Sequence, residues 1–372
     1  MDSTATWMER ILSHAGIGVR GVDAWDLEIH DASAFRRVAA RGSLALGETY
    51  MERLWDCEAL DVLAERVLRS RLSERSRPDW RARWHAAKAR IQNLQDRRRS
   101  RRVARVHYDL GNDFFKAMLD PQMQYSCGYW SGGAQNLVQA QEAKLELVCR
   151  KLRLAPGDRV LELGCGWGGF ARWAAERHGA EVVGYTISGE QSEWARRWCR
   201  DLPVEIRLAD YRDARGRFDH VVSIGMFEHV GPRNYRTFFE TVHDRLREGG
   251  RFLLQTIGGG REEAVIDPWI ERYIFPGSVL PSLKGIAIGI EGLFGLEDWH
   301  GFGPDYDRTL MAWHRNFEMA WPEFQIRLGE RFERMWRYYL LTCAGSFRAR
   351  QNHLWQILLI KGTAEADRAT IR

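Results

Sequence analysis

One stretch decides the fold of this chain: Val160-Leu161-Glu162-Leu163-Gly164-Cys165-Gly166-Trp167-Gly168-Gly169-Phe170. A short apolar run ends in Gly-x-Gly-x-x-Gly and continues directly into residues 171–176, which have the composition of a helix. The glycines suit a turn whose backbone angles a Cβ forbids, and they let a ligand lie against unpaired helix N–H groups. The pattern predicts a strand, a tight turn and a helix N-terminus that holds a nucleotide-like cofactor. The same motif also serves NAD, FAD and plain strand-to-helix turns, so it does not identify the cofactor by itself.

The second predicted strand, 181–185, narrows the choice of cofactor. A dinucleotide site requires an acidic residue about 20 residues further on, at the tip of that strand. The strand leads instead into Thr186-Ile187-Ser188, so NAD is not expected. Further strands are predicted at 204–208, 218–224, 251–255 and 354–360. This order resembles class I S-adenosylmethionine-dependent methyltransferases, an α/β fold in which helices cover both faces of a Rossmann-like seven-stranded sheet. A doubly wound domain without a cofactor is the alternative.

The resemblance implies an S-adenosylmethionine site along the ends of these strands. Glu162 and the glycine turn would lie near the methionine portion, Thr186 or Gln191 near the ribose, and Asp210 with Tyr211 near the adenine. The expected cofactor-binding residues are Tyr125, Ser126, Glu162, Gly164, Gly166, Thr186, Ile187, Gln191, Asp210, Tyr211 and Ile224.

Length and composition limit the classes of protein to which this chain can belong. With 372 residues and 45% hydrophobic content, the chain can form two globular domains or one large one. It has no apolar run of about 18 residues and no signal peptide, so we expect a cytoplasmic protein. Its six cysteines show no Cys-x-x-Cys or Cys/His spacing, which argues against a metal site or a disulfide framework. The 16 Trp, 16 Phe and 11 Tyr suit an apolar ligand or a membrane interface.

Residues 1–95 are predicted to form a helical N-terminal domain that contacts the membrane or a second subunit. Leu60, Leu63, Ala64, Val67 and Leu68 follow helical spacing, and a loop over 41–48 is expected to separate two helices. A basic linker follows at 96–105, with five arginines in the six positions 97–102. This run is either a solvated face or a contact for anionic lipid headgroups. We expect no nucleic-acid partner, because no nucleic-acid-binding module accompanies the arginines.

The predicted catalytic domain spans 106–372. Asn112 is expected to cap a helix that buries Phe114, Phe115, Met118 and Leu119. Another helix, ending near 152, leads to the glycine turn. Prolines and aromatic residues over about 261–305 indicate a lid over an apolar cavity, or otherwise a loose surface excursion. Helices are expected over 308–320 and 332–341.

Several motifs in fixed order resemble the cyclopropane-fatty-acyl-phospholipid synthases. They lie at residues 107–113, 125–127, 164–169, 225–231 and 273–276. The resemblance covers essentially the whole chain. It includes the N-terminal domain, which the otherwise similar mycolic acid cyclopropane synthases lack. It also implies a homodimer that is associated peripherally with the inner face of the membrane, with the phospholipid bilayer as partner.

The implied reaction transfers a methylene group from S-adenosylmethionine to a cis double bond of a phospholipid acyl chain. An alkene is a poor nucleophile, so the sulfonium must be held in line with it in a dry pocket. In the resembled family the resulting carbocation loses a proton to a bound bicarbonate. The implied ligands of bicarbonate are the main chain of Cys127 and Ile257, the side chains of Glu228 and Tyr306, and a histidine. This chain has Gln255 at the histidine position. His107 is a further catalytic candidate, although a structural hydrogen bond explains it as well.

Three rival functions stay open at this point. The nearest is a methyltransferase of the same fold that gives methyl- or methylene-branched acyl chains because its base is altered. A small-molecule or polyketide C-methyltransferase would not need the basic run or the helical N-terminal domain. A lipid-binding protein without enzymatic activity would not bind S-adenosylmethionine.

Overall fold

The computed structural model describes residues 3–71, 110–259, 266–362 and 371–372 of the chain. These residues form two compact units. The first contains residues 3–71, 266–276 and 306–352, and the second contains residues 110–259, 277–305, 353–362 and 371–372. The predicted basic linker at 96–105 and His107 lie outside the described residues. None of the helices in the described part of the chain is both long and apolar enough to cross a bilayer.

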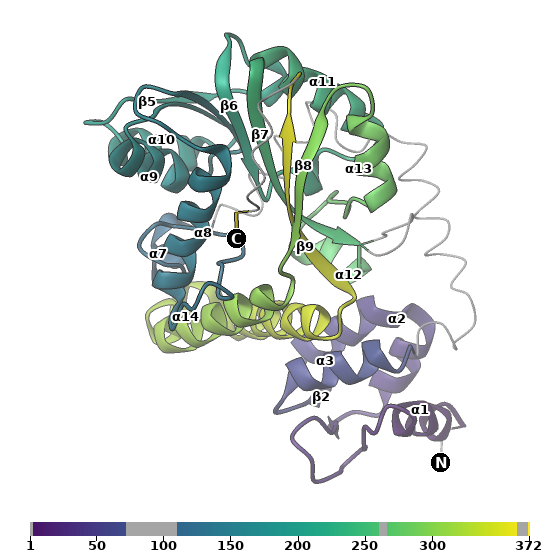
Figure 1. The fold of residues 1–372 in the computed structure, drawn as a ribbon. Helices are drawn as coiled ribbons and strands as arrows, with labels where there is room; N and C mark the ends of the chain where they lie inside the picture. Colours follow the sequence, from purple (N-terminus) through teal and green to yellow (C-terminus); the bar gives the residue numbers. More distant parts are fainter. Residues whose placement is uncertain (1–2, 72–109, 260–265, 363–370) are drawn as a thin grey trace. The chain divides into compact units, whose positions relative to one another are not determined.

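The second unit is built on a mixed sheet of seven strands (Figure 1). Its order is β5-β4-β3-β6-β7-β9-β8, with parallel pairing from β5 through β7 and antiparallel pairing between β9 and β8. The strands are β3 Arg159–Leu163, β4 Glu181–Thr186, β5 Val204–Leu208, β6 Phe218–Ile224, β7 Leu246–Gly259, β8 Gly295–Gly301 and β9 Asn352–Ile360. This arrangement confirms the predicted fold class.

Alternation along the strands divides the core of this unit between the two faces of the sheet. Val160, Val182, Val222 and Leu253 pack with helices α8 and α9, while Leu161, Val221 and Phe252 pack with α11 and α13. The flanking helices are α8 Leu137–Leu152, α9 Gly169–His178, α10 Gly189–Trp198, α11 Tyr235–Arg245 and α13 Leu283–Ile290. Because successive side chains of a strand point to opposite faces, each strand supplies both layers of the core.

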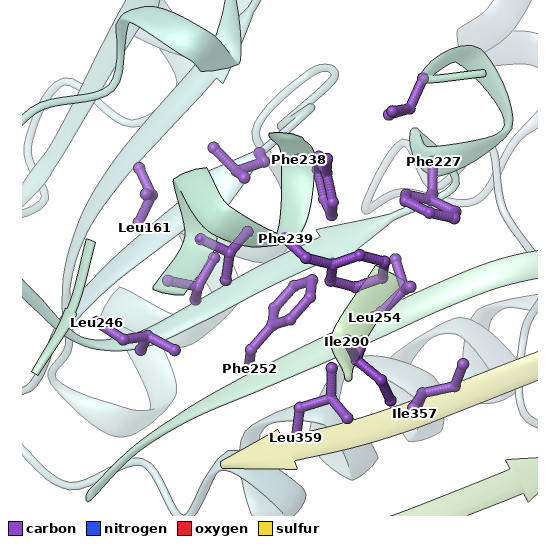
Figure 2. Packing of buried hydrophobic residues seen from close by; sticks show 14 of the residues in the cluster. Leu161, Phe227, Phe238, Phe239, Leu246, Phe252, Leu254, Ile290, Ile357 and Leu359 are labelled. Carbon is purple, nitrogen blue, oxygen red and sulfur yellow. The ribbon is translucent and has the colours of Figure 1, made fainter. Parts of the chain in front are cut away.

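Aromatic side chains fill the layer between the sheet and α11 (Figure 2). Phe227 belongs to the 3-10 turn Phe227–His229 after β6, and its ring contacts Phe238 edge-on at a centroid distance of 5.0 Å. Phe252 of β7 lies 6.0 Å from Phe238 in the same cluster. The fully buried Phe227 anchors the turn that carries Glu228, so this packing positions a candidate catalytic residue.

The sequence missed one strand of the sheet. β8 lies inside the segment predicted as a lid, and its residues are exposed or half-buried without alternation. An edge strand of this kind leaves no period-two hydrophobic pattern to detect. β7 is also longer than predicted, because it begins at Leu246 and ends at Gly259. The lid itself stays a prediction.

The first unit consists mainly of helices, with one two-stranded sheet. Its elements are α1 Ser3–Ser13, β1 Glu28–Ile29, α2 Ser33–Met51, β2 Trp55–Asp56, α3 Leu60–Arg69, α12 Pro268–Tyr273 and most of α14 Pro304–Arg348. The buried Arg334 of α14 donates to the carbonyl of Tyr50 at 2.6 Å and to Asp56 Oδ1 at 2.6 Å. Its guanidinium also lies 4.0 Å from the centre of the Tyr50 ring. A single arginine therefore ties three segments of this unit together.

Two glycines explain where the helix predictions for the first unit succeeded and failed. The predicted loop at 41–48 is wrong, because α2 runs through it with only a kink at Gly42, where φ is 58°. The helices predicted at 308–320 and 332–341 both belong to α14, which is interrupted at Gly329 with φ of 74°. Glycine adopts positive φ without strain, so a glycine can bend a helix where the composition suggests a loop.

Candidate active site

The glycine turn has the geometry that the sequence predicted. Gly164, Gly166 and Gly168 have φ values of 83°, 53° and 84°, in the left-handed region that favours glycine. A Cβ built on Gly166 would meet no atom within 4 Å, so open space lies beside the backbone at this residue. Gly168 precedes α9 and provides no side-chain cap for it. The turn thus fits a cofactor that lies against the main chain.

Asn112 supports this turn in a way that the sequence did not indicate. The prediction that Asn112 caps the following helix is wrong, because Gly111 is the N-cap of α7 Asn112–Met118. The Asn112 side chain instead accepts a hydrogen bond from the indole N–H of Trp167 at 2.7 Å. The predicted burial of Phe114, Phe115 and Met118 is confirmed. The helix is therefore tied to the glycine turn through Trp167.

Thr186 and Gln191, predicted as alternatives for the ribose, lie together at the N-terminus of α10. The Thr186 hydroxyl donates to Gln191 Oε1 at 3.2 Å. Ser188 caps the helix, since its Oγ accepts from the Gln191 N–H at 3.4 Å. The side chains of Thr186 and Gln191 are both buried, and that of Ile187, which follows Thr186, is half-buried. They can act as one pair rather than as alternatives.

Asp210 and Tyr211 follow β5 and begin a 3-10 turn, Tyr211–Asp213. The Asp210 carboxylate accepts from the backbone N–H of Arg212 at 3.0 Å and from its Nε at 2.8 Å. The Tyr211 ring packs edge-on against Phe238 at 5.3 Å. One oxygen of Asp210 already accepts both hydrogen bonds from Arg212, so a contact with adenine would use the other oxygen.

The loop that carries Tyr125, Ser126 and Cys127 is held at both ends. Tyr125 packs edge-on against Phe115 at a ring distance of 5.4 Å. At the other end, the Asp305 carboxylate accepts from the N–H groups of Trp130 at 2.6 Å and Ser131 at 2.8 Å. The intervening carbonyl of Ser126 accepts from Gln141 Nε2 at 2.8 Å. The loop is therefore fixed by packing, a carboxylate and an amide.

A buried lysine next to this loop was missed by the sequence reasoning. Lys144 of α8 is fully buried, and its ammonium donates to Ser126 Oγ at 3.0 Å and to the side chain of Gln124. Burial lowers the pKa of Lys144 to about 8. The sequence does contain a signal for this burial: Lys144 lies one helical turn from Ala140 and from Val148, both buried. A lysine on an apolar helix face needs a polar partner.

Glu162 lies near this lysine and is also buried. Burial raises the pKa of Glu162 to about 8, while Lys144 and the N–H of Ala171 lower it. One carboxylate oxygen has no hydrogen-bond partner among the described residues. Glu162 thus reaches the N-terminus of α9 and keeps one oxygen available for a ligand.

Four of the five predicted bicarbonate ligands come together at the ends of β6 and β7. Glu228 Oε1 accepts from the backbone N–H of Ile257 at 2.6 Å, and its other oxygen is buried without a partner among the described residues. Gln255 Nε2 lies 3.5 Å from the carbonyl of Cys127. Burial raises the pKa of Glu228. Ile224, a predicted cofactor contact, pairs with Gln255 across the two strands, so the two predicted sites adjoin.

Tyr306, the fifth predicted ligand, belongs to the first unit. Its ring packs against Phe347 at 4.6 Å and edge-on against Trp313 at 6.0 Å. Tyr306 is 9% exposed, so its side chain is largely buried. Its role in anion binding stays a prediction.

Known proteins similar to this chain identify its family. A family described as mycolic acid cyclopropane synthetase matches residues 95–357. The cyclopropane-fatty-acyl-phospholipid synthase of Escherichia coli (strain K12) is 49% identical over 352 residues, which are 95% of this chain and 92% of that protein. The tuberculostearic acid methyltransferase UfaA1 of Mycobacterium tuberculosis is 34% identical over 367 residues, 90% of this chain and 83% of that protein.

Solved structures of cyclopropane synthases share the fold. The cyclopropane synthase MmaA2 from Mycobacterium tuberculosis is 31% identical and aligns with a TM-score of 0.67 over 70% of this chain and 98% of its own. The mycolic acid cyclopropane synthase CmaA1, in a complex with SAH and CTAB, is also 31% identical, with a TM-score of 0.66 and coverage of 70% and 98%. The predicted resemblance is confirmed. The chain therefore belongs to the mycolic acid cyclopropane synthetase family of S-adenosylmethionine-dependent methyltransferases.

Proposed function

We propose that this enzyme transfers a methylene group from S-adenosylmethionine to the cis double bond of an unsaturated phospholipid acyl chain and so forms a cyclopropane ring. The observation that carries the proposal is the cluster of Cys127, Glu228, Gln255 and Ile257 at strand ends, where Gln255 pairs with Ile224, a predicted cofactor contact. An ordinary methyltransferase needs only the cofactor half of this arrangement. The 49% identity to the Escherichia coli synthase supports the same substrate class.

The cofactor half of the site binds and orients. The cofactor supplies a methyl group on a sulfonium. The glycine turn offers main chain and open space for it, Thr186 and Gln191 offer a hydroxyl and an amide, and Ser126 is held by Lys144. Because Ser126, Thr186 and Gln191 are buried, they help to exclude water from an alkene that reacts only when it is held in line.

The anion half would hold bicarbonate, which supplies the base. Gln255 Nε2 and the Ile257 N–H are the donors available to it, and the latter is shared with Glu228. Burial raises the pKa of Glu228, which favours its protonated form. A protonated Glu228, or the O–H of bicarbonate itself, removes the repulsion between two adjacent anions.

We also propose that the enzyme acts as a homodimer bound peripherally to the inner face of the membrane. Membrane binding is supported by the arginine run at 97–102, which lies outside the described residues, together with the lipid substrate. The homodimer rests on the family resemblance alone. Binding to anionic vesicles should then fall steeply with ionic strength, because exposed charges are screened within about 10 Å at 0.1 M salt. Equal vesicle binding by a variant with all five arginines replaced by Gln would contradict this part of the proposal.

The decisive experiment is expression in a host that lacks cyclopropane lipids, followed by gas chromatography with mass spectrometry of the phospholipid acyl chains. Cyclopropane acyl chains are expected. Methyl- or methylene-branched chains alone would favour the second candidate, a C-methyltransferase of the same fold. The observation that favours this candidate is Gln255, which cannot titrate as the histidine of the resembled family does.

A further inference from the structure

Two buried glutamines face each other on neighbouring strands of the sheet. Gln255 of β7 and Gln356 of β9 are 1% and 0% exposed, and Gln356 Nε2 donates to Gln255 Oε1 at 2.9 Å. Leu253 and Leu358, two residues away on each strand, both pack against the cluster formed by α8 and α9. The alternation of strand side chains therefore places the two amides on the same face.

The carbonyl of Cys127 decides how the Gln255 amide is turned. A backbone carbonyl can only accept, so the atom of Gln255 that lies 3.5 Å from it must be the nitrogen. The Gln255 oxygen then faces Gln356, which must present its own nitrogen. The polarity of both amides thus follows from one main-chain oxygen, and not from a free choice of flip.

This polarity leaves donor capacity on Gln255. An amide nitrogen carries two N–H groups, and the described residues provide it with one acceptor, at the long distance of 3.5 Å. The arrangement is not optimal for stability, because Gln356 Oε1 is buried and has no partner among the described residues. An unpaired buried acceptor is a cost that an apolar residue at 356 would avoid.

We propose that Gln356 is a positioning residue that, together with the carbonyl of Cys127, holds the Gln255 amide with its NH₂ group toward the bicarbonate site. This inference rests on the bicarbonate part of the proposed function. Gln255 is neutral and has an acceptor at one end and a donor at the other, so a rotation of 180° would turn an oxygen toward the anion. The N–H of Gln356 holds the oxygen on the opposite side. A histidine at 255 would need no such restraint, since its tautomers can adapt.

The test uses the full-length protein and measures bicarbonate binding by the rise in Tm and by calorimetric titration, with S-adenosylhomocysteine titrated separately. Gln356→Met removes the donor and keeps the volume. It should weaken bicarbonate binding about five-fold, the equivalent of one neutral hydrogen bond, and leave S-adenosylhomocysteine affinity unchanged. Leu358→Met, on the same face of the same strand, is the matched control and should leave both affinities unchanged.

A second variant separates positioning from damage to the fold. In the Gln356→Met background, Gln255→His should restore bicarbonate affinity, because the ring can donate without a restraint from residue 356. Wild-type bicarbonate affinity in Gln356→Met would overturn the inference alone. A parallel loss of S-adenosylhomocysteine binding, or no rescue by the histidine, would show a structural role and overturn it as well. If bicarbonate does not bind the wild type at all, the bicarbonate part of the proposed function fails and this inference fails with it.

Discussion

Glu162 and Glu228 are buried carboxyl groups at the ends of the same sheet, and their surroundings differ. Glu162 has the ammonium of Lys144 nearby and reaches the N–H of Ala171. Glu228 accepts from the N–H of Ile257, and no cation in the described part of the chain forms an ion pair with it. Burial raises the pKa of both groups. The cofactor half of the site therefore has a cation close to its carboxyl group, whereas no cation of the described residues pairs with the carboxyl group of the anion half.

The difference explains what each half can bind. Near Glu162, burial favours the protonated carboxyl, and the glycine turn leaves main chain and open space at Gly166 for a ligand. Near Glu228, a bound anion must bring a proton donor or meet a protonated carboxyl, because the described residues offer it an amide and an N–H group but no paired cation. Substitutions should accordingly affect cofactor binding in the first half and turnover in the second.

The largest effect is expected for Gly166→Val. The new side chain would occupy the open space beside the turn, and S-adenosylmethionine binding should be lost while helical content is retained. Isothermal titration and circular dichroism measure these two properties. Gly249→Val is a matched control, because Gly249 also has positive φ and open space around its Cβ. Both variants carry a backbone cost of about 1–2 kcal/mol, so only the loss of binding distinguishes Gly166. Wild-type cofactor affinity in Gly166→Val would rule out this placement of the cofactor.

Glu228→Gln should have the next largest effect, and it should separate the two halves. The amide keeps the size of the side chain and can still accept from the Ile257 N–H, but it cannot exchange a proton with a bound anion. We expect kcat on vesicles to fall by about 10²–10⁴-fold, the usual range for a lost acid–base group. S-adenosylhomocysteine affinity should stay within error of the wild type. A variant that loses both would show that the halves are not independent.

A smaller effect is expected for Gln255→His. A charged histidine would donate a charge-assisted hydrogen bond, worth about 1.5–3 kcal/mol against about 0.5–1.5 for the neutral amide. The bicarbonate concentration needed for half-maximal activity should fall about five-fold or more, and branched by-products should decrease. The gain should be greater at lower pH, where the imidazole is protonated. Identical bicarbonate dependence and product ratio in wild type and variant would make this position neutral.

The sequence was sufficient for the regular part of the sheet and for the glycine turn. β5 and β6 match the predicted strands residue for residue. Val204, Ile206 and Leu208 alternate with charged residues along β5, and β6 is a largely buried parallel strand, so both leave a pattern in the sequence. β8 was missed because an edge strand with exposed residues has no such pattern.

The side-chain contacts of the site depend on tertiary structure. Lys144 with Ser126, and Gln356 with Gln255, join residues 18 and 101 positions apart. Single-sequence patterns do not encode such pairs, since they report on one element at a time. The resemblance pointed to Glu228 and Gln255. It gave no indication of Gln356, which donates to Gln255, or of Lys144, which donates to Ser126.

The smallest effect is expected in the pH dependence of stability, which tests whether Glu162 is protonated in the folded protein. The folded pKa of Glu162 is about 8, above the ordinary value of 4.5. Between these values the folded state keeps a proton that the unfolded state releases, so this group makes stability fall as pH rises. Lys144, with a pKa of about 8, is protonated in both states over most of this range and adds little slope. Glu162→Gln removes the titrating group and should flatten the curve.

The measurement is the Tm of wild type and Glu162→Gln at pH 5, 6.5 and 8. The difference, wild type minus variant, should decrease by a few degrees from pH 5 to pH 8, at about 2–4 °C for each kcal/mol. In the variant, Lys144 no longer has a neighbouring carboxyl group that can ionise, so the pKa of Lys144 in the folded state falls further. The stability of the variant then rises with pH, which also reduces the difference in Tm. A constant difference would mean that Glu162 stays ionised as a true ion pair with Lys144. The two carboxyl groups would then differ in charge state at neutral pH as well as in surroundings.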